Sequence, residues 1–180
     1  FSIAHGVWLT EEEIRTMAET GAAISHNPSS NLRLRSGIAP LNALIEAGVT
    51  VGLGMDGTTI NEDEDMFNEI RLAMRLHRTP RLGSPAPRTS EVFGMATQGG
   101  ARLMRKEYEI GRLAPGYKAD LALVDLETVT WPWVAPEVDP VELILAQASR
   151  GDVVTVMIDG NIVLDDGKPT RFDLDEAGAE

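Results

Sequence analysis

His5, His26 and Asp56 each stand where a short apolar segment gives way to a polar loop. Imidazole nitrogens and carboxylate oxygens bind divalent metals, with zinc the first choice and iron or manganese also suited to such donors. A carboxylate can also take a proton from a water molecule that a metal activates. The three positions therefore indicate acid–base or metal chemistry, although Asp56 taken alone also fits an ordinary Asp-Gly turn after a buried strand.

The spacing of these residues does not by itself specify a metal. The chain has three histidines, and none forms the His-x-His or His-x-x-x-His pattern that makes a metal assignment specific. The third, His77, falls on the apolar face of a predicted helix, where we assign it a structural role. The acidic run 62–65 lacks the alternation of an EF-hand loop and is interpreted as a solvated loop leading into a helix. The serines at 29, 30 and 36 lack a nucleophile motif.

Alternating strands and helices are predicted to position the candidate side chains. Strands are expected at 1–4, 22–25 and 49–53, with helices at 11–20, 41–47 and after Asp65, and the polar segment 29–37 is expected to be a loop. Such alternation builds parallel sheets, and (β/α)8 barrels gather catalytic groups at the carboxyl ends of their strands. An open doubly wound sheet would show the same local pattern, but the sequence has no glycine-rich phosphate loop to support it.

Local signals set the ends and the packing of these elements. Thr10 and Glu13 have the spacing of a capping box, and Gly21 is expected to end the first helix. Gly52 and Gly54 should let other parts of the chain approach the third strand closely. A later helix, starting at Thr89 or Ser90, contains Gly99-Gly100, a pair that costs helix stability and indicates close packing.

The pattern after residue 110 is that of a small β module. A strand is predicted at 121–125, a short helix at 142–148, and a hairpin of 153–159 and 161–165 with a tight turn at Asp159-Gly160-Asn161. We therefore predict an α/β chain of two domains: residues 1–110 from a TIM-like barrel and residues 111–180 from a small β domain with a connecting helix.

Composition excludes several classes of partner. The net charge is −12, which argues against nucleic acid or an anionic membrane as a partner. No apolar run approaches the roughly 20 residues of a membrane span. The absence of cysteine excludes disulfides and thiolate metal sites and fits a reducing compartment, so we expect a cytoplasmic protein.

Five motifs together resemble the C-terminal half of an amidohydrolase-superfamily enzyme, in the branch of cytosine deaminases, guanine deaminases and triazine hydrolases. They are His-Gly-Val-Trp-Leu-Thr at 5–10, the Ser-His-Asn-Pro segment at 25–40, Gly-Leu-Gly-Met-Asp-Gly at 52–57, Asn-Glu-Ile-Arg-Leu-Ala at 68–73, and Ile-Gly-Arg-Leu-Ala-Pro-Gly-Tyr-Lys-Ala-Asp-Leu at 110–121. The resemblance spans nearly the whole chain in order and spacing. It implies strands six to eight of a distorted (β/α)8 barrel that holds one divalent metal, followed by part of a β-sandwich.

The resemblance also implies roles for individual residues. Asp56 matches the acid after the eighth strand, which binds the metal and transfers a proton. His5 matches the histidine beside the attacking water and the substrate. His26 is expected to shape the pocket, and Asn31 and Asn61 to lie in loops on its substrate side. The implied ligand is a small heterocycle, the implied metal is zinc or else iron, and relatives of this kind are expected to form homo-oligomers.

The family's remaining metal ligands are missing from the sequence. It contains neither the His-x-His after the first strand nor the fifth-strand histidine with its nearby glutamate. Because the chain begins without Met inside a predicted strand, and because three barrel strands leave open edges, we expect an upstream half that supplies these ligands.

Three functions are compatible with these observations. The first is hydrolytic deamination of a purine, pyrimidine, pterin or triazine by metal-activated water. The second is a non-catalytic scaffold of the same fold, and the third is hydrolysis of a cyclic amide.

Overall fold

The computed structural model describes residues 1–57, 63–80, 82, 85–135 and 137–172. The chain divides into two compact units, Phe1–Glu107 and Tyr108–Glu180. Each unit has its own sheet and is described separately below. The assignment of residues 1–110 to a hydrolase barrel and of residues 111–180 to a small β domain stays a prediction.

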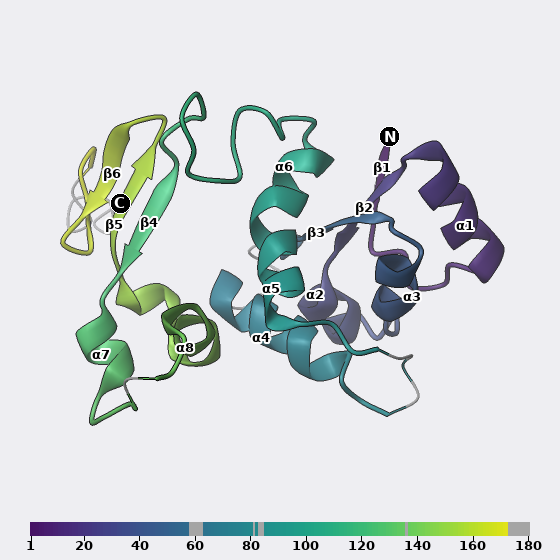
Figure 1. Cartoon of the computed structure of the whole chain (residues 1–180), viewed down its shortest axis with the longest axis horizontal. Helices are drawn as coiled ribbons and strands as arrows, with labels where there is room; N and C mark the ends of the chain where they lie inside the picture. The colour runs from purple at the N-terminus through teal and green to yellow at the C-terminus, as the bar shows by residue number, and fades with distance from the viewer. Residues whose placement is uncertain (58–62, 81, 83–84, 136, 173–180) are drawn as a thin grey trace. The chain divides into compact units, whose positions relative to one another are not determined.

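Three parallel strands form the sheet of the first unit. They are β1 (Ser2–Ala4), β2 (Ala23–His26) and β3 (Thr50–Leu53), and they lie in the order β1-β2-β3 (Figure 1). Ile24 of β2 pairs in register with Ile3 on one side and with Val51 on the other. The three predicted strands are thus confirmed, and because they are parallel, their carboxyl ends meet at one edge of the sheet.

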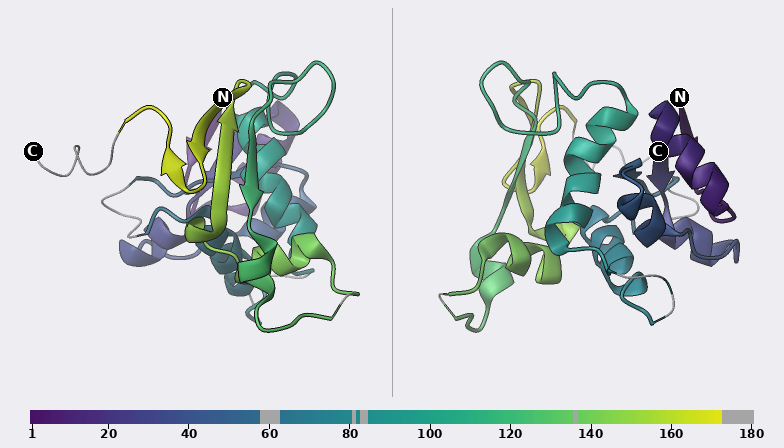
Figure 2. Two further views of the ribbon diagram at one scale, coloured as in Figure 1. Left: turned by 90° about the vertical axis from the view of Figure 1, so that its left-hand side faces the viewer. Right: turned by 45° about the vertical axis from the view of Figure 1, so that its right-hand side comes forward.

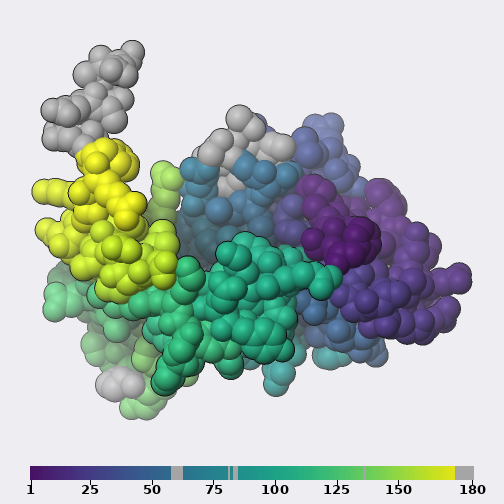
Figure 3. Space-filling model, turned by 90° about the horizontal axis from the view of Figure 1, so that it is seen from above, coloured from purple at the N-terminus to yellow at the C-terminus, as the bar shows by residue number. Residues whose placement is uncertain are grey.

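Helices connect the strands and cover the core of this unit. Helix α1 (Glu11–Thr20) joins β1 to β2, whereas α2 (Pro28–Arg33) and α3 (Leu41–Glu46) lie between β2 and β3 in the chain. The buried apolar side chains of the core include Ile14, Met17, Ile24, Leu41, Leu44, Val51, Leu53 and Val92. The N-terminal residues lie on the surface seen in Figure 3, in dark purple, and Phe1 is exposed. This position agrees with β1 being an edge strand among the described residues.

The ends of α1 form as predicted. The Thr10 hydroxyl oxygen accepts a hydrogen bond from the Glu13 amide, and the Glu13 carboxylate accepts one from the Thr10 amide. The backbone hydrogen bond holds the pKa of the exposed Glu13 carboxyl below its usual value. Gly21 ends the helix with φ of +66°, a left-handed conformation that suits glycine.

The segment after His26 differs from the sequence prediction. Residues 28–33 form helix α2, although the polar run 29–37 was predicted to be a loop. Pro28 begins the helix, where its missing amide hydrogen costs nothing. The Asn31 amide donates to the Asn27 carbonyl, and the Leu34 amide to the Ser30 carbonyl. Because the inner face of this helix is polar rather than apolar, hydrophobic periodicity gives no sign of it.

Helix α4 (Met66–Leu76) begins at Asp65, whose carboxylate accepts hydrogen bonds from the amides of Phe67 and Asn68. The helix predicted after Asp65 is thus confirmed, and Asp65 is its cap. His77 follows the last turn and is buried, as predicted for a structural residue.

The helix predicted from residue 89 is a continuous run of α5 (Thr89–Gly94), η1 (Met95–Gly99) and α6 (Gly100–Leu103), drawn in teal in Figure 1. The middle segment η1 has π-helical geometry, which the sequence did not predict. A Cβ atom on Gly99 would lie 2.2 Å from the carbonyl oxygen of Val51, and one on Gly52 would lie 2.1 Å from Leu103 Cδ1. The predicted close packing is confirmed at Gly52 and Gly99 but not at Gly100, where a Cβ would have no neighbouring atom within 4 Å.

The second unit is built on an antiparallel sheet. Its strands β4 (Leu121–Val124), β5 (Val153–Ile158), β6 (Asn161–Asp165) and β7 (Lys168–Pro169) pair in chain order, and Figure 2 shows the first three side by side. Three short helices accompany them: α7 (Leu126–Thr130), α8 (Pro140–Gln147) and η2 (Arg150–Asp152). The strand at β4, the hairpin of β5 and β6 and the helix α8 are confirmed, whereas α7, η2 and β7 were not predicted.

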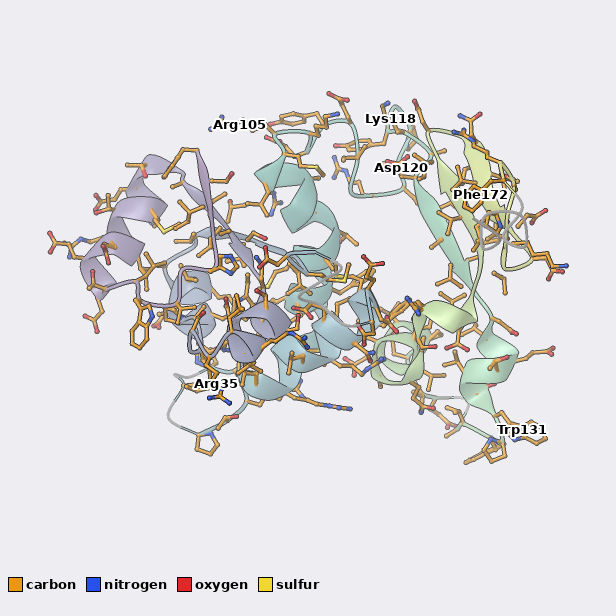
Figure 4. All side chains as sticks on the ribbon, turned by 180° about the vertical axis from the view of Figure 1, so that it is seen from behind. Arg35, Arg105, Lys118, Asp120, Trp131 and Phe172 are labelled. Atoms are coloured by element: carbon orange, nitrogen blue, oxygen red, sulfur yellow. The ribbon has the colours of Figure 1, made fainter. Side chains whose placement is uncertain are left out.

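Polar contacts tie the hairpin turn to the start of β4. Asp159 and Gly160 both have positive φ, at +50° and +78°, as a tight hairpin turn requires. Lys118 Nζ lies 3.0 Å from Asp159 Oδ2, and Asp120 Oδ1 accepts a hydrogen bond from the Asp159 amide at 2.7 Å. Lys118 and Asp120 lie at the same end of β4 in Figure 4, whereas Trp131 extends from the far end of α7.

Candidate functional site

The carboxyl edge of the parallel sheet carries the candidate side chains. His5 follows β1, His26 ends β2, and Asp56 lies three residues after β3. The His5 amide donates to the Ser25 carbonyl at 2.9 Å, and the Gly54 amide donates to the His26 carbonyl at 3.0 Å. The strand ladder therefore extends to His5 and His26 themselves and, on the third strand, to Gly54, two residues before Asp56.

His5 and Asp56 face each other across this edge. His5 Nε2 lies 3.8 Å from Asp56 Oδ2, and the two side chains are 37% and 28% exposed. Both residues have left-handed backbone conformations, with φ of +66° for His5 and +72° for Asp56. Residues other than glycine rarely adopt this region, and where they do, the surrounding structure must hold them there. Such positions cluster at functional sites.

Asn31 determines which nitrogen of His5 carries the hydrogen. The Asn31 side-chain oxygen lies 2.9 Å from His5 Nδ1. Because an amide oxygen can only accept, Nδ1 must donate, and Nε2 of the neutral imidazole keeps a lone pair. That lone pair faces a carboxylate oxygen, an arrangement that is favourable when a proton or a cation lies between the two atoms.

Ser30 was not among the predicted site residues, yet it contacts Asp56 directly. Its hydroxyl donates to Asp56 Oδ2 at 2.6 Å, and its side chain is 0% exposed. Oδ2 is the oxygen in both described contacts of Asp56, so Oδ1 has no hydrogen bond to any of the described residues. A serine with no nucleophile motif gives little signal in the sequence, and only the helical placement of residues 28–33 brings it to the carboxylate.

His26, the last residue of β2, is buried against His77. It is 1% exposed, and its Nε2 is 3.0 Å from Nε2 of His77, which is equally buried. Burial, with a smaller contribution from the neighbouring His77, lowers the pKa of His26 to about 3. Burial lowers the pKa of His77 to about 4. Both rings are therefore neutral at physiological pH.

The remaining predicted contact, Asn61, lies outside the described residues. Residues 1–57, 63–80, 82, 85–135 and 137–172 contain no group of three or more histidine, cysteine, aspartate or glutamate side chains placed to hold a metal ion. The Asp56 carboxylate nevertheless has the donor chemistry of a zinc ligand. The His5 lone pair beside it can accept a hydrogen bond from a water molecule.

Parallel strands with polar groups gathered at their carboxyl ends are typical of (β/α) barrel enzymes. Residues 1–163 match the Amidohydrolase family. The chain belongs to this family, which has a fold of the TIM-barrel type.

Proteins of known structure and function resemble the chain closely. It is 39% identical over 162 residues to a 5-methylthioadenosine/S-adenosylhomocysteine deaminase of Thermococcus kodakarensis, covering 90% of this chain and 37% of that protein. An adenosine deaminase of Xanthomonas campestris with bound zinc superposes with a TM-score of 0.91 at 34% identity, covering 99% of this chain and 40% of that one. An atrazine chlorohydrolase of Arthrobacter aurescens in complex with zinc gives a TM-score of 0.87 at 30% identity, with coverages of 99% and 39%.

These likenesses confirm the resemblance to the deaminase and triazine hydrolase branch of the superfamily. The chain spans about two fifths of the length of these three proteins. In the described part of the chain, no helix is both long enough and apolar enough to cross a membrane.

Proposed function

We propose that the full-length protein is a metal-dependent hydrolase that removes the amino group from an aromatic N-heterocycle. An adenosine-type nucleoside is the first choice of substrate, because a relative covering most of this chain and a well-superposed structure are both named as deaminases of adenosine derivatives. In this proposal β1, β2 and β3 are strands six to eight of the barrel, and the antiparallel sheet of the second unit is part of a β-sandwich.

The single observation that carries the proposal is the facing pair of His5 and Asp56. The two side chains come from different strands, approach to 3.8 Å, and are both held in left-handed backbone conformations. A base and a carboxylate placed in this way can both contact one water molecule that lies beside the pair. A chance pair of surface side chains would not need both residues to adopt an unfavourable backbone conformation.

A divalent metal, zinc first and iron second, would lower the pKa of a bound water molecule and so supply the nucleophile. Asp56 would provide one of its ligands. The zinc in two of the similar structures supports this choice of metal. The other ligands would come from the upstream half that the sequence leads us to expect.

Deamination requires one carbon–oxygen bond to form, one carbon–nitrogen bond to break, and a proton to move from water to the departing nitrogen. His5 Nε2 accepts a hydrogen bond from the attacking water and directs its oxygen toward the ring carbon. The Asp56 carboxylate takes a proton from that water and delivers it to the amino group, which leaves as ammonia. The Asn31 oxygen keeps the Nε2 lone pair available by holding the hydrogen on Nδ1.

Three further residues are assigned to the substrate side of the pocket. His26 shapes the floor of the pocket, and Asn61, five residues after Asp56 in the sequence, contributes to its substrate side. Asn31 is buried, and its side-chain nitrogen has no hydrogen bond to the described residues. We expect this nitrogen to face the pocket. The homo-oligomeric state and the cytoplasmic location stay predictions.

The experiment is elemental analysis of the natural full-length protein and of its Asp56→Ala variant, followed by an ammonia-release assay. We expect about one zinc or iron per chain in the wild type and a loss of metal in the variant. Asp165→Ala, at an exposed aspartate of β6, is the matched control and should retain metal and activity. The assay would use adenosine, 5′-methylthioadenosine, a pterin, an aminotriazine and a cyclic amide.

Each outcome decides between the proposed functions. Ammonia from a nucleoside supports the deaminase, whereas turnover of the cyclic amide alone would favour that hydrolase. A folded full-length protein with no metal and no turnover would overturn the mechanism and favour a scaffold of the same fold.

A further inference from the structure

Three consecutive residues of α2 make three different contacts. The Ser29 amide donates to Glu69 Oε1 of α4 at 3.0 Å. The Ser30 hydroxyl donates to Asp56, and the Asn31 side chain accepts from His5. Since α2 follows the central strand β2, one short element reaches the groups that stand after both outer strands.

Asp56 needs a partner to stay in one place. Asp56 lies on a turn with φ of +72°, next to Gly57 with φ of +145°, and the Asp56 side chain is partly exposed. A carboxylate in such a position can rotate about two side-chain bonds, and fixing it costs conformational entropy. A buried hydroxyl 2.6 Å from one oxygen is a short, charge-assisted hydrogen bond that selects a single orientation.

We propose that Ser30 is a positioning residue that holds the Asp56 carboxylate toward His5, through the hydrogen bond from its hydroxyl to Asp56 Oδ2. The expected effect of Ser30 on kcat rests on the proposed function. Its expected effect on the orientation of Asp56 rests on geometry alone. Ser30 is completely buried, so it acts through Asp56 and not by touching the substrate.

The support for Ser30 continues into the core. Glu69 is itself buried, and burial is the largest influence on its pKa, which is raised. Its contact with the Ser29 amide fastens the start of α2 to α4. The buried contact of His26 with His77 joins the end of β2 to the end of α4. The hydroxyl of Ser30 is therefore presented by a segment that cannot easily shift, which is the condition for accurate placement of a catalytic group.

The test compares Ser30→Ala with Ser36→Ala in the full-length protein. Ser36 lies three residues after the end of α2 and takes no part in the contacts of Asp56 with Ser30 and His5. We expect Ser30→Ala to lower kcat about 10- to 100-fold, the size of a lost hydrogen bond to a charged group, with KM changed less than about threefold. Ser36→Ala should match the wild type. Ser30→Thr, which keeps the hydroxyl, should recover part of kcat if it folds.

Crystal structures of the wild type and of Ser30→Ala provide the readout that does not depend on activity. We expect the Asp56 carboxylate to leave its wild-type orientation or to occupy more than one, while His5 and Asn31 keep theirs. An unchanged, single Asp56 orientation together with an unchanged kcat would overturn the proposal. If the wild type deaminates nothing, the proposed function fails, and the orientation of Asp56 still decides the role of Ser30.

Discussion

Nε2 of His26 lies 3.0 Å from Nε2 of His77, in a buried contact between the end of β2 and the end of α4. Only one of the two nitrogens can carry the hydrogen in this bond, so the two rings must hold opposite tautomers. At least one ring must therefore stay neutral, so that its Nε2 can accept this bond. Burial lowers the pKa of His26 to about 3 and that of His77 to about 4, which keeps both rings neutral at physiological pH.

The first prediction is a loss of stability in mild acid. In the unfolded chain both histidines titrate near the usual pKa of 6.5, so between about pH 6.5 and pH 3 the unfolded state binds protons that the folded state does not. Stability is therefore complete above about pH 6.5 and falls as the pH falls. His26 alone should cost about 2 kcal/mol at pH 5, from 1.5 pH units at about 1.36 kcal/mol each.

Urea unfolding at pH 7.5, 6 and 5 measures this loss. The double variant His26→Gln/His77→Gln should be less stable at pH 7.5 and should show a smaller decrease toward pH 5. Val92→Ala is the control, because it opens a cavity at a buried apolar residue without changing a titratable group, and it should keep the wild-type pH dependence. An unaltered decrease in the double variant would show that other groups cause the acid effect.

The second prediction concerns two adjacent glycines in the long helical run. Gly99→Ala would place a Cβ 2.2 Å from the Val51 carbonyl oxygen. This oxygen is a backbone atom of strand β3 and cannot move aside as a side chain could. We expect a loss of about 2–3 kcal/mol or more in unfolding free energy. Gly100→Ala has no atom within 4 Å of the new Cβ and should stabilise the protein by up to about 1 kcal/mol through helix propensity. Thermal and urea unfolding of both variants measure the two changes in stability. Equal changes at Gly99 and Gly100 would refute the close contact at Gly99.

Sequence reasoning located the strands and the candidate site through different signals. The alternation of apolar strands and capped helices is local, and so β1, β2, β3 and the capping box at Thr10 could be predicted from nearby residues. His5 and Asp56 could be selected because each residue follows a strand, and parallel strands bring their carboxyl ends together.

What could not be predicted depends on contacts between distant segments. Ser30 has no local pattern that distinguishes it, and its partner Asp56 lies 26 residues away in the chain. The apolar helix face predicted a structural role for His77, but its partner His26 lies 51 residues away and could not be identified. Helix α2 was missed because its buried residues are polar and are stabilised by neighbours and not by an apolar stripe. The π-helical geometry of η1 likewise lies in a run whose composition is that of an ordinary helix.

The third prediction tests the cap of α1. Thr10→Ala removes the hydroxyl that accepts from the Glu13 amide and should cost about 1 kcal/mol of unfolding free energy. Thr16→Ala is the control, since its hydroxyl donates only to the Glu12 carbonyl within the exposed part of the same helix. It should change stability by less than about 0.5 kcal/mol. Equal losses in the two variants, measured by urea unfolding, would mean that the capping box adds nothing.

The last prediction concerns the backbone strain at Asp56. Asp56→Ala and Asp56→Gly both remove the carboxylate and its hydrogen bond from Ser30, so they differ only in the Cβ that alanine keeps at φ of +72°. Glycine adopts this conformation freely, whereas a Cβ costs roughly 1 kcal/mol there. The glycine variant should therefore be the more stable of the two by about this amount, and both should be inactive.

Asp165 of β6 provides the opposite case, because it lies in an extended strand. There the glycine variant should be less stable than the alanine variant by about 0.5–1 kcal/mol. Parallel urea denaturation of the four variants measures the two differences. A reversal of sign between the two positions shows that the backbone of Asp56 is held in an unfavourable conformation by its surroundings, which is what a site that must fix one carboxylate requires. If the glycine variant is less stable than the alanine variant at both positions, the backbone of Asp56 is not strained.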